Sequence, residues 1–222
     1  MSGFRAILGK DLRVELRTWQ SVPAMVLFAV GAFILFRFGL DEVTLEGALA
    51  AGVLLVTVLF AGILAVNRLF VAERDEGGFD GLRLAPVPGS SVFCAKAAAL
   101  FIYLCLFELV AVPVFAMFFL GGTAGLLPLV GVLLLMNTGI AATGAVVSPI
   151  AANSRSRDLL VPMLLLPLLV PVIIATASAA APLLAADGPR YAGVGRWLLV
   201  AGLYDAVFLL VGYVLYDFLL ED

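Results

Sequence analysis

Six stretches of this sequence are long and apolar enough to cross a membrane as helices, and no other feature constrains the fold more. They lie at 22–40, 47–67, 92–120, 126–151, 159–184 and 197–220. A helix needs about 20 apolar residues to cross the ~30 Å hydrocarbon core of a bilayer. A membrane-spanning strand would instead alternate apolar and polar residues over about ten positions, and these stretches are apolar on every side. The sequence therefore predicts an all-α polytopic membrane protein in which residues 1–222 form a single transmembrane domain.

The composition excludes most other classes of protein. Hydrophobic residues make up 64% of the chain and charged residues 13%, whereas soluble domains average about 45–50% and about 25%. There is no histidine, so the commonest metal ligand and the commonest acid–base group at neutral pH are missing. The two cysteines, Cys94 and Cys105, cannot form a zinc site alone, and a net charge of −3 offers no general basic surface for nucleic acid. We expect no catalytic residue, no metal site and no nucleic-acid partner. We expect the chain to be surrounded by a lipid bilayer.

Residues 1–20 differ from the rest of the chain because charged and apolar side chains alternate along them at helical spacing. The apolar positions recur at steps of three and four and so share one helical face: Phe4, Ile7, Leu8, Leu12, Leu16 and Trp19. A basic amphipathic helix of this kind lies in the membrane interface. We therefore expect an interfacial elbow helix over 1–20, the alternative being a basic flank that only fixes orientation.

The basic residues predict how the chain is oriented. With six spans, both termini lie on one side of the membrane. Ten of the 13 basic residues fall on that side: Arg5, Lys10, Arg13, Arg17, Arg68, Arg74, Arg83, Lys96, Arg155 and Arg157. Only Arg37, Arg190 and Arg196 fall on the other side. Because loops rich in lysine and arginine stay in the cytoplasm, we expect a multi-pass protein of the cell membrane with both termini cytoplasmic.

The connection at 68–91, between the second and third spans, is long for a link between two helices. It carries four acidic and three basic side chains, with Phe79, Leu82 and Leu84 among them. A short amphipathic helix ending before Pro86 would fit both the charges and the apolar positions. Large apolar side chains among charges favour a docking element for a cytoplasmic partner, and the alternative is a solvated charged loop.

Two acidic residues, Glu108 and Asp205, fall well inside the predicted spans, whereas Asp217 lies near the cytoplasmic end of the sixth span. Charged side chains in hydrocarbon are costly, and they often mark functional sites. We consider both as candidates for a role in transport or coupling. The alternative is that they act as polar contacts that hold helices together.

Several segments together carry a family resemblance. They are 64–70 (LAVNRLF), 73–77 (ERDEG), 82–88 (LRLAPVP) and, in the fifth span, 166–177 (LPLLVPVIIATA). With the amphipathic start of the chain and the six spans in order, they resemble the haem exporter B family of cytochrome c maturation (CcmB). One departure is 77–80 (GGFD), where the family pattern would have serine or threonine, leucine and glutamate.

The resemblance implies the permease subunit of an ABC transporter of the ABC-2 type. In such proteins the N-terminal helix is an elbow, and the connection between spans two and three is a coupling helix seated on the ATPase. The residues that would face the ATPase are Glu73, Arg74, Asp75, Glu76, Phe79, Leu82 and Arg83. ATP would be bound by a separate CcmA-like subunit, because the only glycine–lysine pair, Gly9-Lys10, lacks the flanking residues of a P-loop.

The family assignment implies a pathway that handles haem. Haem iron is commonly held by His, Cys, Met or Tyr, and this chain has no histidine. We therefore expect no cofactor bound by this chain alone, with haem held by CcmC-like and CcmE-like partners and the permease acting as a homodimer. Two alternatives stay open: an ABC-2 permease for a lipid or drug, and a membrane scaffold that transports nothing.

Overall fold

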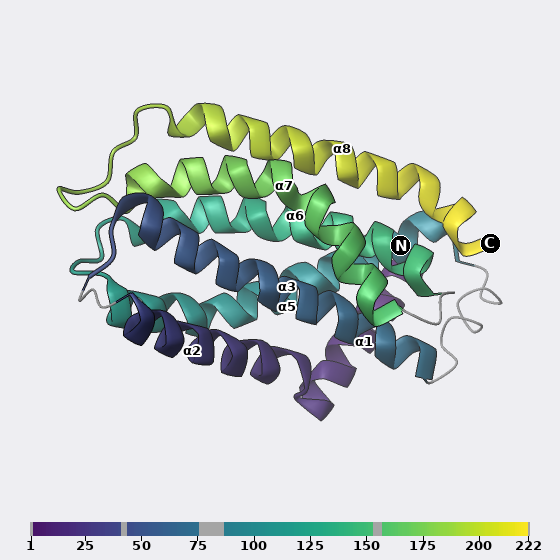
Figure 1. The fold of residues 1–222 in the computed structure, drawn as a ribbon. Helices are drawn as coiled ribbons and strands as arrows, with labels where there is room; N and C mark the ends of the chain where they lie inside the picture. Colours follow the sequence, from purple (N-terminus) through teal and green to yellow (C-terminus); the bar gives the residue numbers. More distant parts are fainter. Residues whose placement is uncertain (1, 41–43, 76–86, 153–156, 222) are drawn as a thin grey trace.

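The computed structural model shows a bundle of long helices lying side by side, with a shorter helix packed near the end where both termini lie (Figure 1). The backbone is described for residues 2–40, 44–75, 87–152 and 157–221, and side chains for 3–40, 44–69, 87–150 and 159–218. Within these residues there are helices and no β-strand. The prediction of an all-α protein is confirmed.

Seven helices make up the described part of the chain. They are α1 (Ser2–Thr18), α2 (Ser21–Gly39), α3 (Gly47–Asp75), α5 (Gly89–Phe119), α6 (Leu126–Ala152), α7 (Arg157–Leu183) and α8 (Val194–Glu221). All except α1 are long and apolar enough to cross a membrane. They follow the order of the six predicted spans, so the chain is a multi-pass membrane protein.

Helix α3 extends beyond its predicted span. The apolar stretch was expected to end at residue 67, and the helix continues to Asp75. A helix need not stop at the membrane surface, because charged residues such as arginine and glutamate are good helix formers. The first part of the predicted coupling segment 68–91 is therefore a rigid continuation of a membrane span.

Helices α3 and α6 form the interior of the bundle, whereas α2 and α8 are mostly exposed to the surroundings. Helix α6 packs against α3, α5, α7 and α8. Small residues allow this close approach: a Cβ atom added to Gly144 would lie 2.5 Å from the Val66 side chain of α3. In membranes, small residues at helix contacts let backbones approach and so replace the missing hydrophobic driving force.

Helix α1 packs against α5 and does not stand apart from the bundle. Ile7 is buried in this contact, and Leu8 and Leu12 are partly buried against the core. Leu16 and Trp19, at the far end of the same predicted apolar face, are exposed. The amphipathic face is thus divided between the bundle and the surroundings.

Both termini lie at the same end of the bundle (Figure 1), as an even number of spans requires. The basic residues expected in loops at this end include Arg83 and Arg155, which lie outside the described residues. Lys96 is an exception to that expectation, because it lies inside α5 and only 1% of its surface is exposed. Its partner, described below, explains how a cation is tolerated there.

The opposite end of the bundle is tied together by backbone hydrogen bonds. The Leu45 N–H donates to the Phe119 carbonyl at 2.8 Å, and the Gly47 N–H donates to the Leu184 carbonyl at 2.7 Å. These bonds join the three connections α2–α3, α5–α6 and α7–α8. The last also carries an exposed ion pair, Arg190 with Asp187 at 2.6 Å, and hydrogen bonding to that guanidinium lowers the pKa of the Asp187 carboxyl.

Candidate functional site

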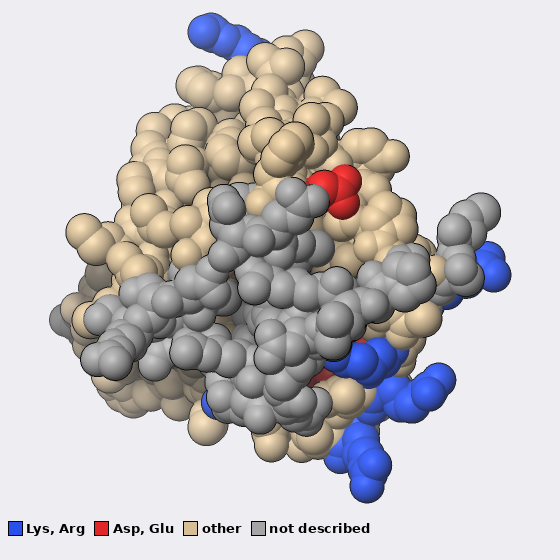
Figure 2. Space-filling model, turned by 90° about the vertical axis from the view of Figure 1, so that its right-hand side faces the viewer, with Lys and Arg blue, Asp and Glu red and all other residues tan. Residues whose placement is uncertain are grey.

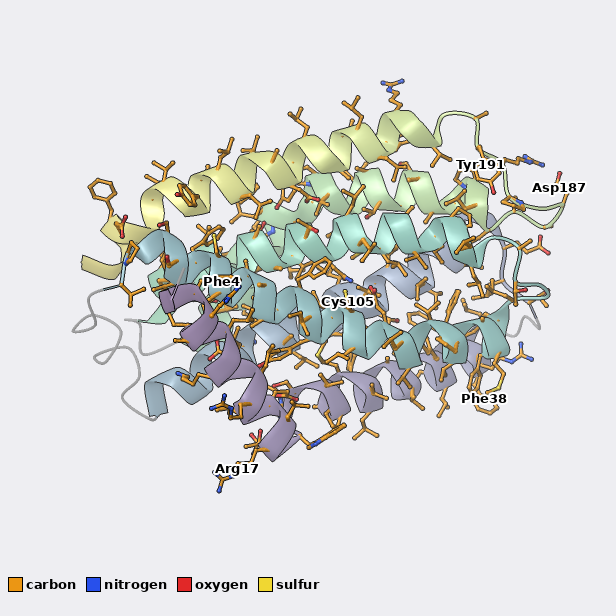
Figure 3. All side chains as sticks on the ribbon, turned by 180° about the vertical axis from the view of Figure 1, so that it is seen from behind. Phe4, Arg17, Phe38, Cys105, Asp187 and Tyr191 are labelled. Carbon is orange, nitrogen blue, oxygen red and sulfur yellow. The ribbon has the colours of Figure 1, made fainter. Side chains whose placement is uncertain are left out.

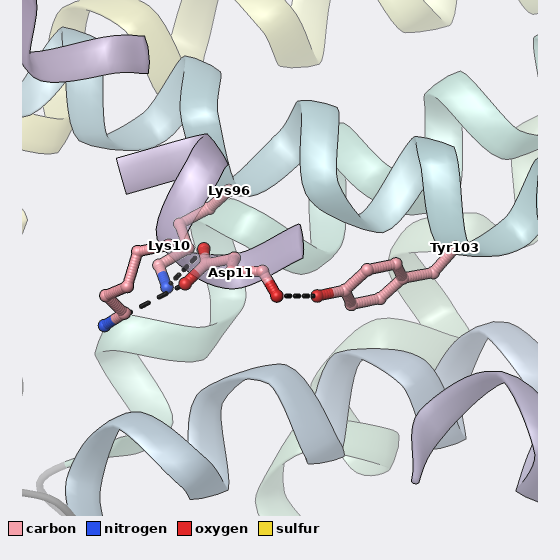
Figure 4. Close-up of polar contacts among 4 residues, drawn as sticks. All are labelled: Lys10, Asp11, Lys96 and Tyr103. Atoms are coloured by element: carbon pink, nitrogen blue, oxygen red, sulfur yellow. Dashed lines mark hydrogen bonds and ion pairs between the residues drawn. The ribbon is translucent and has the colours of Figure 1, made fainter. Parts of the chain in front are cut away.

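A buried ion pair fixes α1 to α5 (Figure 4). The Lys96 ammonium lies 2.9 Å from an Asp11 carboxylate oxygen, and only 4% of the Asp11 surface is exposed. The Tyr103 hydroxyl donates to the Asp11 backbone carbonyl at 2.9 Å. Lys10 lies at the edge, 3.9 Å from the same carboxylate and half exposed. A charge buried with its counter-ion is costly to separate, so α1 is bound to the bundle by more than its apolar face.

The corner between α1 and α2 is held by side chains from both sides. Glu15 of α1 accepts hydrogen bonds from the Ser21 and Val22 N–H groups at 2.8 and 2.9 Å. The first N–H groups of a helix lack intrahelical partners, and a side-chain oxygen that accepts from them stabilises the helix start. Arg68 of α3 donates to the Gln20 carbonyl at 2.8 Å. The corner therefore connects three helices.

Sequence reasoning missed Asp11 and Glu15, although a signal was present. They lie four residues apart and continue the helical stripe that begins at Ile7, which is on the apolar face. Two carboxylates on an apolar face predict buried partners. The cation that satisfies Asp11 comes from a helix 85 residues further along the chain.

Part of the predicted ATPase-facing set can be located. Glu73, Arg74 and Asp75 form the last turn of α3, for which only the backbone is described. Glu76, Phe79, Leu82 and Arg83 lie outside the described residues. Arg68, at the start of the predicted segment, contacts the α1–α2 corner through Gln20. The predicted coupling segment thus begins next to the α1–α2 corner.

Glu108 lies within α5 and contacts Asn137 of α6, which donates to one carboxylate oxygen at 2.8 Å. The Asn137 amide also lies 3.9 Å from the Cys105 sulfur. The second Glu108 oxygen and the Asn137 oxygen have no hydrogen-bond partner among the described residues. Sequence reasoning identified Glu108 and missed Asn137. The signal was present, because an amide side chain in an apolar span often makes a polar contact with another helix.

Asp205 lies within α8, with 4% of its surface exposed and both carboxylate oxygens without a partner in the described residues. It occupies space left by a glycine, because a Cβ atom on Gly139 of α6 would lie 2.9 Å from an Asp205 oxygen. The neighbouring Tyr204 donates to the Leu168 carbonyl of α7 at 3.0 Å. Since that uses its only proton, Thr143 of α6 must donate to the Tyr204 oxygen at 2.7 Å.

The two acidic residues do not form one site. Asn137, which contacts Glu108, and Gly139, which adjoins Asp205, are two positions apart on α6. At 3.6 residues per turn this places them about 200° apart, on opposite sides of the helix. Within the described residues no group of three or more acidic or cysteine side chains could hold a metal ion. Glu108 thus makes a polar contact between helices, whereas Asp205 is a buried carboxyl without a partner among the described residues (Figure 3 labels Cys105, one turn before Glu108, about halfway along the bundle).

Comparison with known proteins adds independent information. The family model described as "CcmB protein" matches residues 2–214. "Heme exporter protein B" of Rhodobacter capsulatus is 30% identical over 171 residues, covering 77% of this chain and 78% of that protein. The protein of the same name from Paracoccus denitrificans is 31% identical over 181 residues, covering 79% and 81%. That from Bradyrhizobium diazoefficiens is 27% identical over 175 residues, covering 78% and 79%. The resemblance found in the sequence is confirmed, and the chain belongs to the CcmB family.

Proposed function

We propose that this chain is the haem-exporting permease subunit of an ABC transporter for cytochrome c maturation. The observation that carries the proposal is the family match over residues 2–214, with relatives named "Heme exporter protein B". Six apolar helices suit a permease. The chain is not itself the ATPase in this proposal, and it couples hydrolysis by a separate CcmA-like subunit to haem export or to remodelling of a haem-handling complex.

The contacts of the elbow suggest how movement at the ATPase reaches the membrane helices. In this proposal the segment 68–91 seats on the ATPase and moves the end of α3. Arg68 passes that movement to Gln20 at the α1–α2 corner, where Glu15 also holds the start of α2. The ion pair between Asp11 and Lys96 carries it on to α5. All three contacts lie towards the end of the bundle that carries both termini, which the proposal places in the cytoplasm.

Haem itself would be held by partner subunits of the CcmC-like and CcmE-like types. The chain has no histidine, and its four described methionines, Met25, Met117, Met136 and Met163, come from four different helices. Met117 and Met163 face outward and Met25 and Met136 are buried in the core. This scatter supports a role in which the chain transmits force, as a homodimer, and leaves axial ligation of haem to its partners.

The proposal is tested with variants of the proposed docking segment, by measuring whether the ATPase still co-purifies with the chain. Phe79→Asp and Leu82→Asp, each in the proposed docking segment, should abolish co-purification of the ATPase and production of mature cytochrome c. The conservative variant Phe79→Leu is the matched control and should keep both. If the Asp variants co-purify with the ATPase as well as the wild type does, the segment is not the dock and a non-transporting scaffold becomes the better description.

A further inference from the structure

Two adjoining cavities lie on the surface of α5 and have opposite character. The first, of about 400 Å³, is lined by Phe4 and Arg5 of α1, Ser90, Ser91 and Cys94 of α5, and Tyr213 of α8. Figure 3 shows Phe4 where α1, the start of α5 and the end of α8 meet. We call it the α1 pocket. The second, of about 440 Å³, runs along α5 against α6 and α8 and shares Cys94 with the first. We call it the α5 groove.

The α1 pocket has the chemistry of an anion site with an apolar wall. Arg5 supplies a guanidinium, and Ser90, Ser91 and Tyr213 supply three hydroxyl groups. Among the described residues no carboxylate lines it: Asp217, one turn beyond Tyr213, accepts a hydrogen bond from the Gly89 N–H. Guanidinium and hydroxyl donors together suit a phosphate group. Lys and Arg side chains also gather on one side of this end of the molecule (Figure 2).

The α5 groove has the chemistry of a hydrocarbon site. Its floor is made by four alanines, Ala97 and Ala98 of α5 and Ala141 and Ala142 of α6, beside the rings of Phe93 and Phe101. The one hydroxyl among its described lining residues, that of Thr138, already donates to the Leu134 carbonyl at 2.8 Å. Apart from the weakly polar Cys94 thiol, the described lining therefore offers only apolar surface.

The length of the combined site fits one leaflet of a bilayer. From Ser90 in the pocket to Ile102 in the groove, α5 rises about 18 Å at 1.5 Å per residue. Half of a ~30 Å hydrocarbon core is about 15 Å. A free phosphate would use only the pocket, and an apolar helix only the groove. A molecule with a phosphate at one end and a hydrocarbon chain at the other uses both.

We propose that the α1 pocket and the α5 groove together bind one anionic phospholipid. Its phosphate lies against Arg5, Ser90 and Ser91, and one acyl chain follows the alanine floor of the groove. The lipid belongs to the leaflet in which α1 lies. It holds α1 against α5 and α8 close to the start of α1, whereas the Asp11–Lys96 pair holds it near the middle.

The test uses the full-length protein in its native complex, reconstituted in nanodiscs. The discs contain equal amounts of phosphatidylglycerol and phosphatidylcholine with identical acyl chains, and lipids retained after mild detergent extraction are counted by native mass spectrometry. Both lipids carry a phosphate, but the described lining has an arginine and no carboxylate to pair the choline cation, so we expect selective retention of phosphatidylglycerol, reduced about fivefold by Arg5→Gln. The matched control is Arg13→Gln, an exposed arginine of the same helix that lines neither cavity, and it should retain the wild-type ratio.

A second measurement covers the groove without a variant that could misfold. Cys94 lines both cavities and Cys105 lines neither. In phosphatidylglycerol discs, alkylation of Cys94 by a membrane-permeant maleimide should be several-fold slower than in phosphatidylcholine discs, with the Cys105 rate unchanged.

Four results would overturn the proposal. The first is equal retention of the two lipids. The second is an equal loss of retention in Arg5→Gln and Arg13→Gln, which would indicate diffuse surface charge. The third is protection of Cys94 by millimolar inorganic phosphate alone, which would indicate a free-phosphate site, and the fourth is crosslinking of Cys94 to a partner subunit, which would indicate a protein occupant.

Discussion

Replacing Lys96 by Met tests whether the buried pair with Asp11 holds α1 in place. Methionine keeps most of the length of the side chain and removes its charge, so the buried Asp11 carboxylate loses the cation that lies 2.9 Å from it. The hydrogen bond from Tyr103 goes to the Asp11 backbone carbonyl and is therefore kept in every variant at position 11. A second variant, Asp11→Leu with Lys96→Met, replaces the whole pair by apolar groups.

The expected cost follows from the geometry of the pair. At the 2.9 Å separation seen here, two unit charges attract by about 6 kcal/mol at an effective dielectric constant of about 20. Desolvation of both ions offsets much of that attraction, so an apolar replacement of both is expected to lie within about 1 kcal/mol of the wild type or to be more stable. Removing one partner takes this attraction away while the other ion stays buried, which should cost about 3–5 kcal/mol.

The assay is the free energy of unfolding in mixed micelles as the denaturing detergent is increased. In a Trp197→Phe background, Trp19 fluorescence reports the α1–α2 corner. Lys10→Met is the matched control, because that lysine is 3.9 Å from the same carboxylate but half exposed, and it should cost under about 0.5 kcal/mol. The reasoning fails if Lys96→Met costs less than about 1 kcal/mol, or if the double variant is as unstable as the single one.

Three further changes test other contacts. Glu15→Ala should cost about 1–2 kcal/mol and speed hydrogen exchange of the first amides of α2, because their acceptor is removed; unchanged exchange would show that the corner does not need this cap. Gly139→Ala should destabilise the bundle by forcing its new methyl group against Asp205, and Asp205→Ala in the same chain should restore most of the loss, which denaturant titration would measure. Tyr204→Phe should cost about 1–3 kcal/mol because two buried partners on α6 and α7 lose their hydrogen bonds, whereas Tyr191→Phe, in the exposed outer connection, should be neutral.

The membrane spans could be predicted from the sequence because lipid imposes a local rule. Every backbone polar group in hydrocarbon must be hydrogen-bonded within the protein, so only helices and closed barrels span a membrane, and a long run that is apolar on every side fits a helix. That rule needs no knowledge of neighbouring helices. It fails only at the ends, as with α3, which remains helical to Asp75 after its apolar residues finish.

The elbow contacts could not be predicted in the same way, because they join residues far apart in the chain. Asp11 meets Lys96 and Tyr103, which are 85 and 92 positions away. Nothing in the sequence pattern indicated that Asp11 would contact Lys96 or Tyr103. An acid on the apolar side of α1 and a lone lysine inside an apolar stretch were the two available signals, and their pairing depends on how α1 packs against α5.

The two acidic residues within the spans could also be predicted only in part. Glu108 and Asp205 could be identified because a carboxylate in an apolar run is rare. Their surroundings could not, because the Glu108 partner is an amide on another helix and the Asp205 site depends on a missing side chain at Gly139. Contacts of this kind depend on how closely two helices pack, and a single sequence does not give the distances between helices.

In the proposed function, helix α3 would act as a lever whose pivot lies at the end of the bundle opposite the termini. Its start is tied there by the Gly47 bond to Leu184, and its 29 residues span about 43 Å. A tilt of about 5° around the pivot would carry the Asp75 end sideways by about 4 Å over that length. Arg68, and the elbow to which it is bonded, sit towards the far end of the lever, where the displacement is large. In the proposed function, small rotations driven from that end would therefore reach α1 and α2 almost in full, while the connections at the pivot would move little.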